Sequence, residues 1–201
     1  TMRACLKLCR QFGVNAGAHP GFDDRQNFGR KEEESSRSRL QSLISSQVGK
    51  LISLAQVEGV PIAHIKLHGG LYHVVERDKG LASGYAAFIK ERFPKVRLIA
   101  SPRGELIGAA RSFGIQVWGE LFSDRAYTAQ GGLVPRSQSD AVLTDLAEIR
   151  KQMETFRARG GVCSRDGTLL ALDAQTVCVH ADSPNALHIA RLLASVFRAD
   201  D

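Results

Sequence analysis

The sequence has no long apolar run. Among its 201 residues, no stretch approaches the roughly 20 apolar residues that a membrane-spanning helix needs. The first residues form the pattern of an amphipathic helix rather than a charged segment followed by an apolar core. We therefore expect a cytoplasmic protein with no membrane partner.

Cysteine is scarce, and its spacing excludes two classes of small domain. The four cysteines contain no Cys-x-x-Cys pair, so neither a disulfide scaffold nor a typical zinc site is predicted. Cys5 and Cys9 lie one helical turn apart among apolar neighbours, which favours a buried helix face.

Three catalytic or nucleotide-binding signatures are also missing. The chain has no Gly-x-x-x-x-Gly-Lys-[Ser/Thr] loop and no Gly-x-Gly-x-x-Gly after a strand. It also lacks the Gly-x-Ser-x-Gly turn of an esterase nucleophile. The sequence therefore provides no recognisable phosphate cradle of its own.

The positive charge does not indicate a nucleic-acid-binding protein. The formal net charge is +6, from 27 basic and 21 acidic residues. The basic residues are spread along the chain, and Glu32, Glu33 and Glu34 lie beside several of them. This pattern favours a solvated helix surface over a phosphate-backbone footprint, and it remains compatible with small anions.

The hydrophobic pattern predicts one α/β domain built from repeated βα units. Strand-like runs cover residues 14–18, 62–67, 96–100, 115–118 and 176–179, and helix-like stretches cover 1–13, 36–58, 81–93, 103–113, 144–159 and 183–197. A hairpin at 162–170 interrupts this alternation, and a long connection covers 121–139. The alternation implies a parallel sheet with right-handed crossovers, either open or closed as a barrel.

Polar residues gather where the predicted strands end. His19, His68 and His180 each follow a strand, and residues past the carboxyl ends of parallel strands converge on one face. Such histidines serve proton transfer or metal binding, with ordinary hydrogen-bonded structure as the alternative. Lys66 lies on the same side of its strand as His68. Its amine is expected to act as a base or to bind an anion, and the alternative is a structural ion pair with Glu120.

Further candidates lie in and after the strand-like run at 115–118. Glu120 and Asp124 flank a turn with Arg125, which indicates either a functional cluster or a surface ion-pair network. Arg136 lies in an otherwise uncharged loop and is suited to bidentate binding of a carboxylate or phosphate. His64 is interpreted as a core or wall histidine.

Five ordered motifs resemble the signatures of the LamB/YcsF family, the family of 5-oxoprolinase A subunits. The motifs, spread over essentially the whole chain, are Ala18-His19-Pro20-Gly21-Phe22, Ile65-Lys66-Leu67-His68-Gly69-Gly70-Leu71-Tyr72, Glu120-Leu121-Phe122-Ser123-Asp124-Arg125-Ala126-Tyr127, Leu133-Val134-Pro135-Arg136-Ser137 and Cys178-Val179-His180-Ala181-Asp182-Ser183-Pro184. Small departures are Leu67, where the family often has Pro, and Ala181, where it often has Gly.

The resemblance implies a single (β/α) barrel domain over residues 1–201, related to the glycoside hydrolase/deacetylase superfamily. It also implies ATP-dependent opening of 5-oxo-L-proline to L-glutamate together with 5-oxoprolinase subunits B and C. Family members begin with an Asp-x-Asn-x-Asp-x-Gly-Glu strand and a Gly-x-His-x-Gly-Asp segment, neither of which occurs here. We therefore expect an N-terminally incomplete barrel with exposed apolar edges and impaired activity.

The resemblance assigns roles to ten residues. The expected catalytic residues are His19, His68, Glu120, Asp124 and His180, and the expected substrate-binding residues are Lys66, Tyr72, Arg125, Arg136 and Asp182. The three histidines are also the candidate ligands for a divalent metal, and ATP is expected to bind a partner subunit. The alternatives are a metal-dependent deacetylase-like hydrolase and a non-catalytic carboxylate-binding or assembly subunit, and a homo-oligomer stays open.

Overall fold

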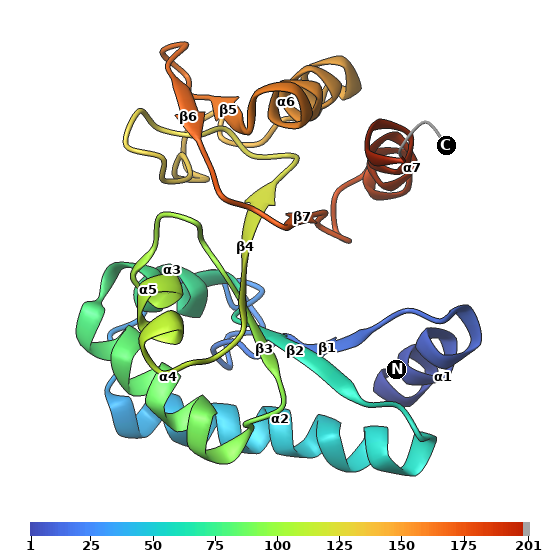
Figure 1. Cartoon of the computed structure of the whole chain (residues 1–201), viewed down its shortest axis with the longest axis vertical. Coiled ribbons are helices and arrows are strands. Elements are labelled where there is room, and N and C mark those ends of the chain that lie inside the picture. Colours follow the sequence, from blue (N-terminus) through green and yellow to red (C-terminus); the bar gives the residue numbers. More distant parts are fainter. Residues whose placement is uncertain (199–201) are drawn as a thin grey trace. The chain divides into compact units, whose positions relative to one another are not determined.

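The structure, a computed structural model, describes residues 1–198 and divides the chain into two compact units. The first unit is Thr1–Trp118, and the second begins at Gly119. Figure 1 labels the helices and strands of each unit.

The first unit contains four strand regions and five helices. In chain order these are α1 (Met2–Phe12), β1 (Ala16–Ala18), α2 (Arg37–Glu58), β2 (Ile62–Lys66), α3 (Gly69–Arg77), α4 (Lys79–Arg92), β3 (Arg97–Ala100), α5 (Glu105–Ser112) and the first residues of β4 (Val117–Phe122). The strands β1, β2 and β3 are neighbours and pair in parallel.

Helix α2 shows how local sequence sets the bounds of these elements. Ser36 caps its start, because its Oγ accepts a hydrogen bond from the Arg39 amide at 3.2 Å. Gly59 ends the helix at a φ of 66°, which glycine adopts without steric cost. Leu40, Ile44 and other residues at helical spacing are buried on one face.

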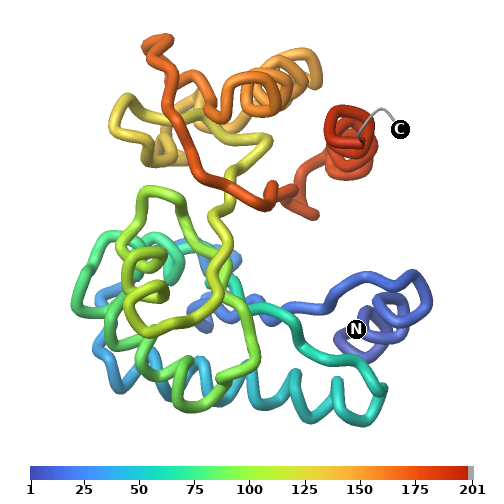
Figure 2. The backbone as a smooth tube through the Cα atoms, in the orientation of Figure 1, coloured from blue at the N-terminus to red at the C-terminus, as the bar shows by residue number. Residues whose placement is uncertain are grey.

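The second unit combines the end of β4 with a helix pair and a hairpin. Its elements are α6 (Leu146–Arg159), β5 (Gly161–Cys163), β6 (Leu169–Ala171), β7 (Thr176–Cys178) and α7 (Ala186–Phe197). The end of β4 pairs in parallel with β7, and β5 pairs antiparallel with β6. Figure 2 traces the connection, in yellow, that leads from β4 to α6. Leu121 of β4 belongs to the same buried cluster as Ile149 and Met153 of α6 and Ile189 of α7.

The predicted α/β class with parallel strands is confirmed, and so is the hairpin. Two element predictions need correction. The strand predicted at 115–118 is Val117–Phe122, so Glu120 lies inside a strand rather than beyond its end. The reason is pairing, since Glu120, Leu121 and Phe122 lie in register with β7.

Helix α3 is the second correction, because the helix-like stretch that contains His73 was predicted without a start, which the structure places at Gly69. In the sequence, the paired glycines Gly69 and Gly70 indicate a turn rather than a helix. In the structure they are the first two residues of the helix.

Apolar surface is exposed at α1 and just after it. Phe12 is 69% exposed and Val14 is 59% exposed. Within residues 1–198, no helix is both long and apolar enough to cross a membrane.

Candidate functional site

The first unit brings two of the predicted histidines together. His19 follows β1, and His68 precedes α3, after β2. His19 Nδ1 lies 2.8 Å from the Lys66 carbonyl oxygen, and His19 Nε2 lies 3.0 Å from His68 Nδ1. His68 Nε2 lies 2.7 Å from the Phe28 carbonyl oxygen. The two rings therefore form the middle of a chain of three hydrogen bonds.

The partners of this histidine pair determine where its protons lie. A carbonyl oxygen can only accept, so His19 Nδ1 and His68 Nε2 are both assigned as donors. The two remaining ring nitrogens, His19 Nε2 and His68 Nδ1, face each other at 3.0 Å. A hydrogen bond between them forms when one of the two carries a proton, so the pair is suited to pass a proton between its rings.

Glycines allow the backbone to approach the His68 ring closely. A Cβ atom on Gly21 would lie 3.0 Å from His68 Cβ, and one on Gly29 would lie 3.0 Å from His68 Cδ2. At the start of α3, a Cβ on Gly70 would lie 2.2 Å from the Lys31 carbonyl oxygen. The loop before α2 therefore packs directly against the backbone of the His68-Gly69-Gly70 motif.

The second unit brings together Asp124, His180 and Arg136. His180 Nδ1 lies 2.9 Å from each carboxylate oxygen of Asp124, which is only 1% exposed. Arg136 Nη2 lies 3.4 Å from His180 Nε2. Because a guanidinium only donates, His180 Nε2 accepts, and its proton is assigned to Nδ1. The Phe122 ring stacks on the His180 ring with centroids 5.7 Å apart.

A network of main-chain contacts holds the turn that carries Asp124. Ser123 Oγ donates to the Cys178 carbonyl oxygen at 2.9 Å, which ties the end of β4 to β7. Gln152 Nε2 of α6 lies within 3.1–3.2 Å of the carbonyl oxygens of Phe122, Ser123 and Arg125. The Asp124 carboxylate is thus fixed before any ligand binds.

Arg125 is buried and has main-chain partners. It is 3% exposed; its Nε donates to the Ala141 carbonyl oxygen at 3.0 Å, and its Nη2 donates to the Val134 carbonyl oxygen at 2.6 Å. These bonds hold the long connection after β4, and the burial of Arg125 excludes an exposed surface position for its guanidinium. Glu120 is also buried, at 4% exposed.

The other predicted site residues differ in exposure. Lys66 is half-buried, Tyr72 is 5% exposed on α3, and Asp182 is exposed before α7. Tyr127, which was not predicted, contributes no charge: its buried hydroxyl accepts from the Phe122 amide at 2.8 Å, and burial raises the pKa of Tyr127 above its ordinary value.

His64 lies on the wall of the sheet, as predicted. It pairs across the strands with Gly17, and a Cβ atom on Gly17 would lie 2.1 Å from His64 Nε2. Burial lowers the pKa of His64 from 6.5, and the charges of Arg97 and Lys66 lower it further.

Sequence reasoning missed three residues that hold the two histidine clusters. Phe28 and Ser123 act through contacts that their residue types do not signal, and Gln152 lies on α6, far along the chain from the turn that it binds. A polar side chain at a buried-face position of α6 was the available signal for Gln152. Within residues 1–198, no group of three or more His, Cys, Asp or Glu residues is placed to hold a metal ion.

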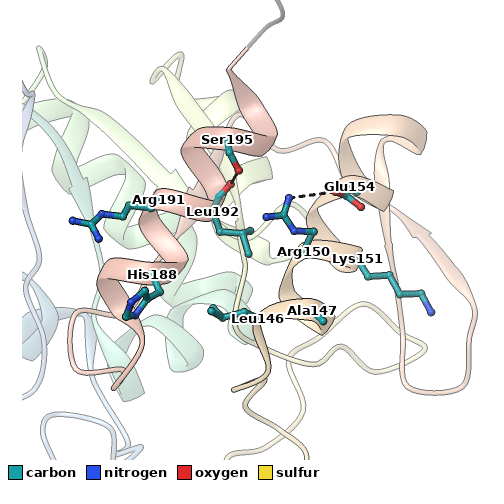
Figure 3. A pocket seen from close by; sticks show the side chains of 9 residues that line it. All are labelled: Leu146, Ala147, Arg150, Lys151, Glu154, His188, Arg191, Leu192 and Ser195. Atoms are coloured by element: carbon teal, nitrogen blue, oxygen red, sulfur yellow. Dashed lines mark hydrogen bonds and ion pairs between the residues drawn. The ribbon is translucent and has the colours of Figure 1, made fainter.

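A groove between α6 and α7 contains none of the predicted site residues (Figure 3). Leu146 and Leu192 line it, with Arg150, Lys151 and Arg191 among the charged residues beside them. We therefore take the hydrogen-bonded histidines, and not this groove, as the candidate site.

Comparison with known proteins gives one consistent family. The model of the LamB/YcsF family matches residues 1–201. A protein of Neisseria meningitidis serogroup A, named as the A subunit of 5-oxoprolinase, is 37% identical over 186 residues, which are 92% of this chain and 76% of that protein. A Chloroflexus aggregans protein of the same name is 37% identical over 185 residues, covering 92% of this chain and 73% of its own.

A solved structure shows the same fold. The crystal structure of a lactam utilization protein from Thermus thermophilus is similar with a TM-score of 0.87 and 34% sequence identity. The similarity covers 97% of this chain and 78% of that one. The family model, the relatives and the structural neighbour agree, and the chain belongs to the LamB/YcsF family.

Proposed function

We propose that this chain acts in lactam metabolism, as the A component of an ATP-dependent 5-oxoprolinase that hydrolyses 5-oxo-L-proline to L-glutamate. The names of the relatives and of the structural neighbour support this class of substrate. The subunit name of the relatives supports an assembly with further subunits, which we propose to be subunits B and C.

The observation that carries the proposal is the pairing of Asp124 with His180. A buried carboxylate that accepts the Nδ1 proton leaves the lone pair of His180 Nε2 directed away from the carboxylate. An imidazole oriented in this way is suited to remove a proton from water as the water attacks a carbonyl carbon. Arg136 Nη2 lies 3.4 Å from His180 Nε2 in this structure, and we propose that its exposed guanidinium turns to bind the substrate carboxylate, which leaves the lone pair to the water.

The proposed reaction breaks the ring C–N bond of the lactam. Hydroxide from the attacking water adds to the carbonyl carbon, and the ring nitrogen takes up a proton as it leaves. An unstrained amide is stable, which supports coupling to ATP. We place that step on a partner subunit because this chain has no phosphate-binding loop signature.

The test is glutamate release from 5-oxoproline and ATP by the chain assembled with subunits B and C. We expect His180→Gln to lower kcat by about 10²-fold or more, the usual range for a general base. His188→Gln on the exposed face of α7 is the matched control and should leave kcat unchanged. Because the relatives are longer, a version extended by the family's first strands is assayed in parallel.

The histidine pair of the first unit is tested by itself. We expect His68→Ala to lower turnover, because the substitution removes one of the two hydrogen-bonded imidazole rings. Turnover equal to that of the unmodified chain would remove His68 from the mechanism. Glutamate formation without ATP, on addition of a divalent metal alone, would instead favour the deacetylase-like alternative. Absence of glutamate from the complete, extended assembly would refute the proposed function.

A further inference from the structure

Phe28 is the one residue other than glycine, within residues 1–198, that has a positive φ. Its φ is 56°, the φ of Gly29 is 67°, and the Arg30 amide donates to the Asn27 carbonyl oxygen at 3.0 Å. Two successive positive φ values closed by this hydrogen bond are typical of a type I′ turn. That turn favours Asn, Asp or Gly at its first central position, so an aromatic residue there is unusual.

The turn directs the Phe28 carbonyl group at the histidine pair. The carbonyl oxygen lies 2.7 Å from His68 Nε2, while the Phe28 ring stands edge-on to the His68 ring, with centroids 5.6 Å apart. The ring is largely exposed, and the Arg30 guanidinium lies over it at 5.1 Å. The main chain of Phe28 therefore makes the hydrogen bond to His68, and its side chain adds only a ring contact.

Other residues hold the turn in place without the Phe28 side chain. Asp24 Oδ1 accepts hydrogen bonds from the backbone and side-chain nitrogens of Asn27, at 3.2 and 2.9 Å. The Asp24 carbonyl oxygen accepts from the Gly29 amide at 2.7 Å, and the Gly29 carbonyl oxygen accepts from the Gly70 amide at 2.9 Å. The turn is thus anchored on both sides, at Asp24 and at the start of α3.

We propose that Phe28 is a positioning residue whose left-handed backbone holds the His68 ring through a main-chain hydrogen bond. The Phe28 carbonyl oxygen keeps the His68 proton on Nε2, which leaves Nδ1 to face His19. The effect of this arrangement on turnover rests on the proposed function, whereas the position of the proton on His68 does not.

Two substitutions at Phe28 separate the backbone from the ring. Phe28→Asn removes the ring but tolerates the left-handed conformation, and Phe28→Val removes the ring with a β-branched side chain that resists this conformation. The readouts are the ¹⁵N chemical shifts of the His68 ring nitrogens, kcat and KM for glutamate release by the assembly, and the thermal midpoint of each variant.

We expect Phe28→Asn to keep the Nε2–H form of His68 and to change kcat by less than about twofold. Phe28→Val should mix the two ring forms of His68 and lower kcat by about tenfold or more, with a smaller effect on KM. If both variants lose the Nε2–H form equally, or if neither does, the positioning role of the Phe28 backbone is wrong.

A pair of glycine substitutions controls for effects of backbone strain that do not involve His68. Gly29→Ala places a methyl group at a φ of 67° and 3.0 Å from His68 Cδ2. Gly59→Ala has almost the same φ, 66°, and meets no atom within 4 Å. Both should lower the thermal midpoint, but only Gly29→Ala should shift the His68 ring nitrogen signals; equal shifts would overturn the proposal. If the unmodified assembly releases no glutamate, the proposed function fails, while the ring nitrogen signals still decide the role of Phe28.

Discussion

Replacing Asp124 by Asn tests whether the buried carboxylate sets the proton on His180. Both carboxylate oxygens lie 2.9 Å from His180 Nδ1. Asn places one amide oxygen and one NH₂ group at that distance from Nδ1, whichever way its amide is turned. The negative charge that held the proton on Nδ1 is lost, and the NH₂ group can donate to Nδ1 only when the imidazole proton is on Nε2, so the proton is expected to move in part to Nε2. On Nε2 it would face the Arg136 guanidinium, 3.4 Å away.

The expected loss follows from the bonds that the substitution breaks. A hydrogen bond to a charged group is worth about 1.5–3 kcal/mol, and we expect a stability loss of at most that size. A general base with its proton on the wrong nitrogen should lose most of its contribution, which is about 10²- to 10⁴-fold in kcat. KM should change less, because Asp124 is only 1% exposed and is therefore not placed to contact the substrate directly.

Two assays check this prediction. Nitrogen-15 spectra of the imidazole report which nitrogen of His180 carries the proton, and glutamate release by the assembly reports kcat. Asp166→Asn is the control, because Asp166 lies in the exposed hairpin turn, where an amide oxygen can still accept from Ser164 Oγ. An Asp124→Asn protein that keeps its proton on Nδ1 and its kcat within about twofold would show that the carboxylate does not orient His180.

Two further predictions concern stability, measured by denaturant unfolding. Gly17→Ala should lower the free energy of unfolding by about 1–3 kcal/mol or more, since its methyl group would lie 2.1 Å from His64 Nε2. Gly49→Ala lies inside α2 with nothing within 4 Å, and it should raise the free energy of unfolding by about 0.5–1 kcal/mol. Equal effects would contradict the packing described for Gly17. Folding lowers the pKa of His64 from 6.5, so as the pH falls the unfolded chain takes up a proton before the folded chain does. The stability that comes from keeping His64 neutral is therefore complete above about pH 6.5 and is lost as the pH falls toward the pKa of the folded state. In that pH range, His64→Gln should weaken the dependence of the free energy of unfolding on pH, and His188→Gln, at an exposed position, should not. If His64→Gln leaves this dependence unchanged, His64 is not its source.

Most helices and strands were predictable because their signals are local. The apolar stripe of α2, its serine cap and its terminal glycine together define the helix within the sequence. The end of β4 was not predictable in this way, since Glu120 is strand because it pairs with Thr176, 56 positions further along the chain. The start of helix α3 was not predictable because Gly69 and Gly70 are poor helix formers, and their role is a close contact with a loop from another part of the chain.

The candidate site was predictable in its histidines but not in what holds them. Repeated βα units place residues after strands at one end of a parallel sheet, which identified His19, His68 and His180. The sequence does not show that a carbonyl group of Phe28 meets His68, because every residue carries such a group and only the backbone conformation decides its direction. The same applies to Arg125, because its residue type does not show that its Nε and Nη2 donate to the carbonyl oxygens of Ala141 and Val134.

These contacts make the His19-Pro20-Gly21 and His68-Gly69-Gly70 motifs a single structural unit. The His68 amide donates to the Pro20 carbonyl oxygen at 2.8 Å, Gly21 lies against the His68 side chain, and the two rings share a hydrogen bond. Glycine in these motifs provides close approach rather than flexibility: a Cβ atom on Gly21 would lie 3.0 Å from His68 Cβ, and one on Gly70 would lie 2.2 Å from the Lys31 carbonyl oxygen. A methyl group at Gly21 should therefore press on His68 as Gly29→Ala does, although the two glycines lie in different turns.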